Sequence, residues 1–183
     1  MDRYKIVVAK RYNLSASDLL LYNRNMNPEL KQFILQYFPE GGKALDLGCG
    51  NGTDVKGLKE MGWKCDGVDL TTGTDLNEVY LSPNAPYDLV YSNYVIQQLK
   101  APESLIITIE KNLKDGGKFF IHTFDKSDEV VKKKYTKESI AKLFENTTLK
   151  PESYKVFRIF DNEIGHHHWH QILQISGTKK SNN

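Results

Sequence analysis

The sequence predicts an α/β fold, a doubly wound and mostly parallel β-sheet with helices on both faces. Segments of strand character alternate with segments of helical periodicity along most of the 183 residues. Such alternation implies right-handed crossovers between parallel strands. In addition, an apolar strand runs into a glycine-rich turn and then a helix, in the stretch Leu45-Asp46-Leu47-Gly48-Cys49-Gly50-Asn51-Gly52. This is how an α/β sheet presents bare backbone to a ligand at the end of its first strand.

The elements follow in chain order from local signals. A first helix is expected from Pro28, because Asn27 is a favourable N-cap and proline suits the first helical position. Gly41-Gly42 ends this helix, and Gly62 ends a second one. Strands are expected at 43–47, 64–69, 87–93 and 116–122, and further helices at 53–61, 103–113 and 136–146.

The C-terminal region predicts a β-hairpin. Residues 154–160 and 169–177 alternate like two strands, joined by a turn at 161–165. A hairpin cannot be parallel, so one antiparallel strand must join the sheet. We expect a single domain over residues 1–178, with 1–40 as an N-terminal helical cover and 179–183 as a frayed tail.

Composition is consistent with one enzyme-sized domain. No apolar run approaches the ~18 residues that a membrane helix needs, so no membrane partner is expected. Cys49 and Cys65 are too few for a disulfide scaffold, which favours the reducing cytoplasm. The formal net charge of +2 does not favour a polyanionic partner, so a nucleic-acid partner is not expected.

The glycine loop and the second strand predict a nucleotide-like ligand. Three glycines within five residues allow a sharp turn and a close approach that any Cβ would block. The second predicted strand ends at Asp69, and a carboxylate there suits bidentate hydrogen bonding to a ribose diol. Nicotinamide, flavin and other nucleotide sites share such a loop, so the loop alone leaves the ligand open.

Several motifs in order resemble the class I S-adenosylmethionine (SAM)-dependent methyltransferases, in their small single-domain form. The match runs from about Lys43 to Phe124 and includes Gly67-Val68-Asp69, Tyr87-Asp88-Leu89-Val90 and Asn112-Leu113-Lys114-Asp115-Gly116-Gly117. The resemblance implies SAM as cofactor and a seven-stranded sheet whose last strand is antiparallel. Only eighteen residues separate Asp69 from Asp88, so the third strand must be shortened, and we expect Thr74-Asp75-Leu76 as its remnant.

The same resemblance implies a set of cofactor contacts. Asp46 would hold the amino end of the methionine, the glycine loop its carboxylate, and Asp69 the ribose hydroxyls. The adenine would lie near Leu70 and against the pair Asp75 and Leu76. The methyl group would point to the end of the fourth family strand. The implied cofactor-binding residues are Asp46, Gly48, Cys49, Gly50, Asn51, Gly52, Asp69, Leu70, Asp75, Leu76, Ser92 and Asn93.

The catalytic residues stay open, because methyl transfer needs a protein base only when the acceptor must lose a proton. Ser92-Asn93-Tyr94-Val95 is neither the Asn/Asp-Pro-Pro-aromatic signature of amino methylation nor a Pro-Cys nucleophile. Gln98 stands near the position at which many family members carry histidine. The candidates are His166, His168 and Tyr12.

Four of the five histidines lie within residues 166–170. In an extended strand, His166, His168 and His170 share one face. Ordinary hairpin packing is the first interpretation, contact with the acceptor the second and metal binding the third; no metal is expected.

The sequence thus predicts a cytoplasmic SAM-dependent methyltransferase for a small-molecule acceptor, acting as a monomer or homodimer. The alternatives are a methyltransferase for a protein or RNA, a SAM-binding module without transfer activity, and, more distantly, a nicotinamide-dependent enzyme.

Overall fold

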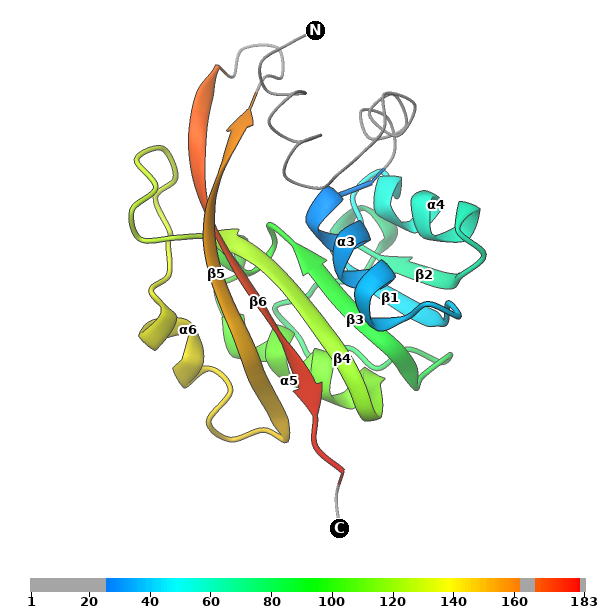
Figure 1. The fold of residues 1–183 in the computed structure, drawn as a ribbon. Coiled ribbons are helices and arrows are strands. Elements are labelled where there is room, and N and C mark those ends of the chain that lie inside the picture. The colour runs from blue at the N-terminus through cyan, green and yellow to red at the C-terminus, as the bar shows by residue number, and fades with distance from the viewer. Residues whose placement is uncertain (1–25, 162–166, 182–183) are drawn as a thin grey trace, which may run out of the picture.

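The fold is known from a computed structural model, which describes residues 26–161 and 167–181. Its centre is a six-stranded sheet with the strand order β2-β1-β3-β4-β6-β5 (Figure 1). The strands are β1 (Lys43–Leu47), β2 (Lys64–Val68), β3 (Tyr87–Asn93), β4 (Leu113–Phe124), β5 (Leu149–Asp161) and β6 (His168–Lys179).

Four α-helices and two 3₁₀ turns connect the strands of the described part. They are α3 (Pro28–Tyr37), α4 (Thr53–Glu60), η1 (Leu70–Thr72), η2 (Ile96–Gln98), α5 (Pro102–Asn112) and α6 (Lys137–Lys142). Helix α3 begins as the sequence predicts, because the Asn27 side chain accepts the Leu30 N–H and Pro28 occupies the first turn. None of the described helices has the combination of length and hydrophobicity required to cross a bilayer.

The sheet is parallel on one side and antiparallel on the other. Strands β2, β1, β3 and β4 all run in parallel. Strand β6 runs antiparallel to both of its neighbours, β4 and β5. The predicted α/β class and the antiparallel last strand are therefore confirmed.

The helices cover both faces of the sheet and bury an apolar core under each. On one face, α3 and α4 pack on residues such as Leu89 and Phe120. On the other, α5 and α6 pack on residues such as Val90 and Ile175 (Figure 1). The parallel strands consequently carry almost continuous buried runs, as expected when both faces are covered.

The expectation of seven strands is wrong for the described residues, because no strand forms at Thr74-Asp75-Leu76. The chain instead passes through η1 and a turn, and the backbone that follows is bound by helix α5. Thr108 Oγ1 accepts the Tyr80 N–H at 3.0 Å, and Asn112 Oδ1 accepts the Ser82 N–H at 2.9 Å. Asn112 Nδ2 also donates to the Tyr80 carbonyl at 2.8 Å. Side chains of α5 thus satisfy backbone groups of the segment that follows the expected strand, and Ser104 Oγ donates to the Leu76 carbonyl within it.

Several element ends also differ from expectation: β4 begins at Leu113 rather than at residue 116, and β5 at Leu149 rather than at residue 154. The helix expected at 136–146 ends at Lys142 and continues as turns. Lys179, expected in the tail, is the last residue of β6, and its ammonium donates to the carbonyls of Glu110 and Leu113 at 2.8 and 2.9 Å.

Candidate functional site

The predicted site residues gather where parallel strands end. Leu47, the last residue of β1, pairs with Val68, the last of β2, and β3 ends beside them at Asn93. The glycine loop, Asp69 and Asn93 therefore lie along one edge of the sheet, the usual place for a ligand in this architecture.

The glycine loop needs its glycines for two different reasons. Gly48, Gly50 and Gly52 have φ of 85°, 51° and 77°, values that side chains disfavour. At Gly48 there is also no space, because a Cβ would lie 2.2 Å from Val95 Cγ2. At Gly50 and Gly52 a Cβ would meet nothing within 4 Å, so these two glycines border open space.

The loop is tied to the end of β2 and leads into α4. The Gly48 and Cys49 N–H groups donate to the Val68 carbonyl at 2.8 and 3.0 Å. Gly52 is the N-cap of α4 and has no side chain of its own to cap the helix. Asn51 Oδ1 accepts both the Thr53 N–H at 3.3 Å and the Thr53 hydroxyl at 2.7 Å. The other N–H groups of this first turn and the positive end of the helix dipole suit an anion.

Asp69 is a partly exposed, ionised carboxylate beside the loop. Asp69 accepts hydrogen bonds from the N–H and the hydroxyl of Thr71 and, at 3.1 Å, from the Gly50 N–H. These bonds hold the pKa of Asp69 below its usual range, and the two from Thr71 have the larger effect. The next side chain, Leu70, is 71% exposed. A charged acceptor next to an exposed apolar surface suits a nucleoside, whose ribose is polar and whose base is flat.

The pair Asp75 and Leu76 is divided between solvent and core. Asp75 is exposed and accepts the N–H and amide of Asn77, and these bonds lower its pKa. The Leu76 side chain is 5% exposed and belongs to the core under α5. The structure therefore leaves the Asp75 carboxylate accessible but turns the Leu76 side chain inward.

Asp46 is buried beneath the loop. Burial raises its pKa well above the usual range, and the nearby charges of Asp54 and Asp69 raise it further, whereas a hydrogen bond from Tyr91 acts in the opposite direction. Among the described residues, no lysine or arginine forms an ion pair with Asp46. A cationic group bound at this point would stabilise the ionised carboxylate.

Asp54 is a site residue that the sequence reasoning missed. Its carboxylate accepts the Asn27 N–H at 2.6 Å and the Asn93 amide at 2.7 Å, and burial raises its pKa. It therefore joins the start of α3, the first turn of α4 and the end of β3. Its position directly after the glycine loop was the one available signal, but many helices carry an acid in their first turn.

Ser92 and Asn93, at the end of β3, differ in accessibility. Ser92 is fully buried and donates to the Leu47 carbonyl at 2.8 Å, which ties β3 to β1. Asn93 Oδ1 is buried and has no hydrogen-bond partner among the described residues. An unpaired buried acceptor at a strand end is a feature that a ligand donor can satisfy.

The backbone after β3 is strained. Tyr94 has φ of 60°, the one non-glycine residue of the described chain with positive φ. Its ring packs on His122 and Phe124, with centroid distances of 5.7 and 5.4 Å. Such strain clusters at functional sites, where surrounding contacts hold it in place.

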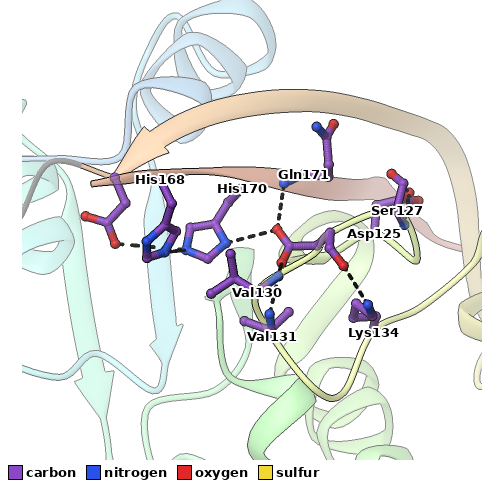
Figure 2. A network of polar contacts seen from close by, with 10 residues as sticks. Asp125, Ser127, Val130, Val131, Lys134, His168, His170 and Gln171 are labelled. Atoms are coloured by element: carbon purple, nitrogen blue, oxygen red, sulfur yellow. Dashed lines mark hydrogen bonds and ion pairs between the residues drawn. The ribbon is translucent and has the colours of Figure 1, made fainter. Parts of the chain in front are cut away.

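The remaining candidates lie mostly at the hairpin. His166 and Tyr12 fall outside the described residues. His168 lies on β6 with its Nε2 3.0 Å from the Nε2 of His170, and His170 Nδ1 lies 2.9 Å from the carboxylate of Asp128 (Figure 2). Gln98 is exposed, and its amide donates to the Tyr94 carbonyl. Burial raises the pKa of the Cys49 thiol, which argues against a nucleophile in the loop.

The fold and the glycine loop define a Rossmann-like domain of the methyltransferase class. The family profile described as "Methyltransferase domain" matches residues 22–176. The chain therefore belongs to the methyltransferase domain family, and the sequence-based resemblance to class I SAM-dependent methyltransferases is confirmed. None of the curated proteins matches the sequence significantly.

Solved structures share this fold at low sequence identity. A SAM-dependent methyltransferase of Methanosarcina mazei is 13% identical with a TM-score of 0.69, over 86% of this chain and 100% of its own. The 1,6-didemethyltoxoflavin-N1-methyltransferase of Burkholderia thailandensis, solved with 1,6-didemethyltoxoflavin and S-adenosylhomocysteine, is 18% identical with a TM-score of 0.65, over 97% and 89%. A methyltransferase of Haloferax volcanii in complex with the activator Trm112 is 15% identical with a TM-score of 0.62, over 82% and 89%.

Proposed function

We propose that this chain transfers the methyl group of SAM to a small-molecule acceptor at the edge formed by β1, β2 and β3. The observation that carries the proposal is the placement of the partly exposed Asp69 carboxylate beside an open glycine loop, with the buried Asp46 carboxyl beneath it. These groups match the hydroxyls, carboxylate and amine that SAM presents at separate points.

Each part of the cofactor has a residue suited to it. Asp69 would accept the ribose hydroxyls, and the exposed Leu70 side chain would contact the adenine. The first turn of α4 would hold the methionine carboxylate. The ammonium of the methionine would lower the pKa of Asp46, which burial otherwise raises.

The chain's contribution to the reaction is chiefly positioning. When bound, SAM supplies an activated methyl group on a sulfonium, which is a good leaving group. Asn93, with its unpaired Oδ1, and the strained Tyr94 lie at the strand end where the acceptor would approach. Holding the acceptor in line with the methyl converts a bimolecular step into an effectively unimolecular one. His168 stays the candidate base within the described residues, for an acceptor that must lose a proton.

Two observations favour a small acceptor. The sequence after β3 lacks the signatures of base and glutamine methylation. The Burkholderia thailandensis enzyme, a neighbour in fold, is named for a small heterocyclic acceptor. The Haloferax volcanii complex shows that this fold also occurs with a protein activator, so protein and RNA acceptors belong in the test.

The test is a calorimetric measurement of SAM affinity for wild type and Asp69→Ala. We expect Asp69→Ala to bind SAM roughly 10- to 100-fold more weakly than wild type. Losing a polar contact that the bound ribose would bury costs about 1–3 kcal/mol. Asp115→Ala is the matched control, since this half-exposed carboxylate lies at the start of β4 and pairs with Lys179. Equal SAM affinity of wild type and Asp69→Ala would remove Asp69 from the site. Binding of a nicotinamide dinucleotide more tightly than SAM would refute SAM as the cofactor.

Turnover then separates the enzyme from a module that only binds SAM. Wild type is incubated with SAM and, separately, with metabolite, protein and RNA pools, and S-adenosylhomocysteine is quantified. We expect acceptor-dependent product with the metabolite pool. Product with protein or RNA alone would refute the small-molecule assignment, and SAM binding without product in any pool would favour the binding module.

A further inference from the structure

Three side chains of the β5–β6 hairpin bring ligand atoms together beyond the end of β4. His168 Nε2 and His170 Nε2 are 3.0 Å apart (Figure 2). His170 Nε2 is 4.0 Å from Asp161 Oδ2. One ligand atom from each of the three residues lies within 4.8 Å of the others. All three residues are partly buried.

The hairpin geometry holds this cluster in place. His168 and His170 are two positions apart on β6 and therefore share one face of the strand. Asp161, the last residue of β5, is the register partner of His168. The cluster thus depends on strand pairing rather than on a loop conformation.

Asp128 fixes the orientation of the second imidazole. Its side chain is fully buried and accepts the Gln171 N–H at 2.7 Å and those of Val130 and Val131 at 2.9 and 3.0 Å. His170 Nδ1 lies 2.9 Å from the same carboxylate, and in the tautomer that donates Nδ1–H to it the Nε2 lone pair faces the cluster. A carboxylate behind the distal nitrogen of a histidine is the usual outer-shell support of a metal ligand.

The spacing of the ligand atoms suits a tetrahedral ion. Two ligands at about 2.0–2.1 Å from a metal with tetrahedral angles are about 3.3 Å from each other. The observed 3.0 and 4.0 Å lie on either side of this value.

We propose that Asp161, His168 and His170 bind one divalent transition-metal ion of the zinc type. Two imidazole nitrogens and one carboxylate favour such an ion over Mg²⁺ or Ca²⁺, which prefer all-oxygen sites. Three protein ligands leave a fourth position open for water or an acceptor heteroatom, and a metal-bound His168 would no longer act as the base of the proposed methyl transfer.

The site lies on the acceptor side of the proposed active site. The His170 ring contacts Phe124 at a centroid distance of 4.9 Å, and Phe124 in turn contacts Tyr94 at 5.4 Å. An ion here would adjoin the strained end of β3 without touching the glycine loop. Metal binding is therefore measurable independently of SAM binding.

The test is a titration of the full chain, made metal-free with a chelator, with Zn²⁺ by calorimetry and with Co²⁺ by visible absorption. We expect one Zn²⁺ per chain and a tetrahedral Co²⁺ spectrum, with no response to Mg²⁺. His168→Ala and Asp161→Ala should each weaken Zn²⁺ binding at least 100-fold. Asp128→Asn should weaken it about 10- to 100-fold, as expected for an outer-shell partner.

His167→Ala is the matched control, because His167 is exposed and neighbours the cluster in the histidine-rich stretch. It should leave Zn²⁺ affinity unchanged. Loss of binding in His167→Ala equal to that in His168→Ala would overturn the ligand set and indicate non-specific capture by the histidine-rich stretch. Absence of Zn²⁺ binding by wild type in a folded sample, judged by circular dichroism, would overturn the proposal as a whole.

Discussion

Gly48→Ala tests whether the glycine loop is closed against the segment after β3. The substitution places a methyl group 2.2 Å from Val95 Cγ2 on a backbone with φ of 85°. Contacts under 3.0 Å force a shift, and the left-handed backbone adds strain of its own. The predicted effect is therefore a loss of stability with two separable causes.

The size of the effect follows from these two causes. The left-handed conformation costs a residue with a side chain roughly 1–2 kcal/mol. Overpacking by one methyl group costs roughly 1–3 kcal/mol. A combined loss of roughly 3 kcal/mol would lower the Tm by roughly 6–12 °C in a chain of this size.

The assay is urea unfolding followed by circular dichroism, arranged as a double-mutant cycle with Val95→Ala. Truncating Val95 removes the atom at 2.2 Å and leaves its Cβ at 3.3 Å, a tight but tolerable contact. The double variant should recover roughly 1–3 kcal/mol relative to additivity, because the clash is then absent. Gly50→Ala is the control, since its φ is 51° and a Cβ there meets nothing within 4 Å.

Two results would refute this reasoning. One is an additive cycle, with coupling under about 0.5 kcal/mol, which is the scatter of independent sites. The other is an equal loss in Gly48→Ala and Gly50→Ala, which would leave backbone strain as the whole effect.

Two more predictions concern buried polar groups. Asp54→Ala should lower the free energy of unfolding, measured with urea, by roughly 2–4 kcal/mol, because the Asn27 and Asn93 donors lose their acceptor. Glu60→Ala is the control, because Glu60 is exposed and its loss should change stability little. A similar loss in both variants would contradict the role of Asp54. Burial lowers the pKa of His122 from about 6.5 in the unfolded chain to about 4 in the folded protein. Neutral His122 therefore contributes its full stability above pH ~6.5, and this contribution is lost as the pH falls from about 6.5 to 4. Wild type should lose about 3 kcal/mol more over this range than His122→Gln, and parallel pH profiles of the two proteins would refute the assignment.

The local signals in the sequence were sufficient for most of the fold. Asn27 and Pro28 begin a helix through contacts within one turn, and the alternation of residues after 154 predicts a hairpin by its period alone. The third strand could not be resolved in this way. Whether the chain after Asp69 pairs with a sheet or with helix α5, as Leu76 does with Ser104 and Ser82 with Asn112, depends on residues 28 to 30 positions away, which no local pattern reports.

The residues of the candidate site also fall into those that local sequence signals identify and those that depend on distant contacts. The glycine loop and Asp69 could be identified from sequence because their backbone requirements are local, and Leu76 could not be placed because its direction depends on the packing of α5. Asp54 and Asp128 were not identified from the sequence, because the role of an acidic residue in a helix or loop depends on partners that are distant in the chain.

By itself, the sequence determined most of the order of strands and helices and the turn that presents bare backbone to a ligand. These follow from interactions among residues a few positions apart, such as caps, glycine turns and alternation. The tertiary structure alone decided which distant groups meet: Asp54 with Asn93, and Asp128 with His170. Such contacts join residues 39 and 42 positions apart, and only the packing of helix α4 and of the loop after β4 against the sheet brings them within bonding distance.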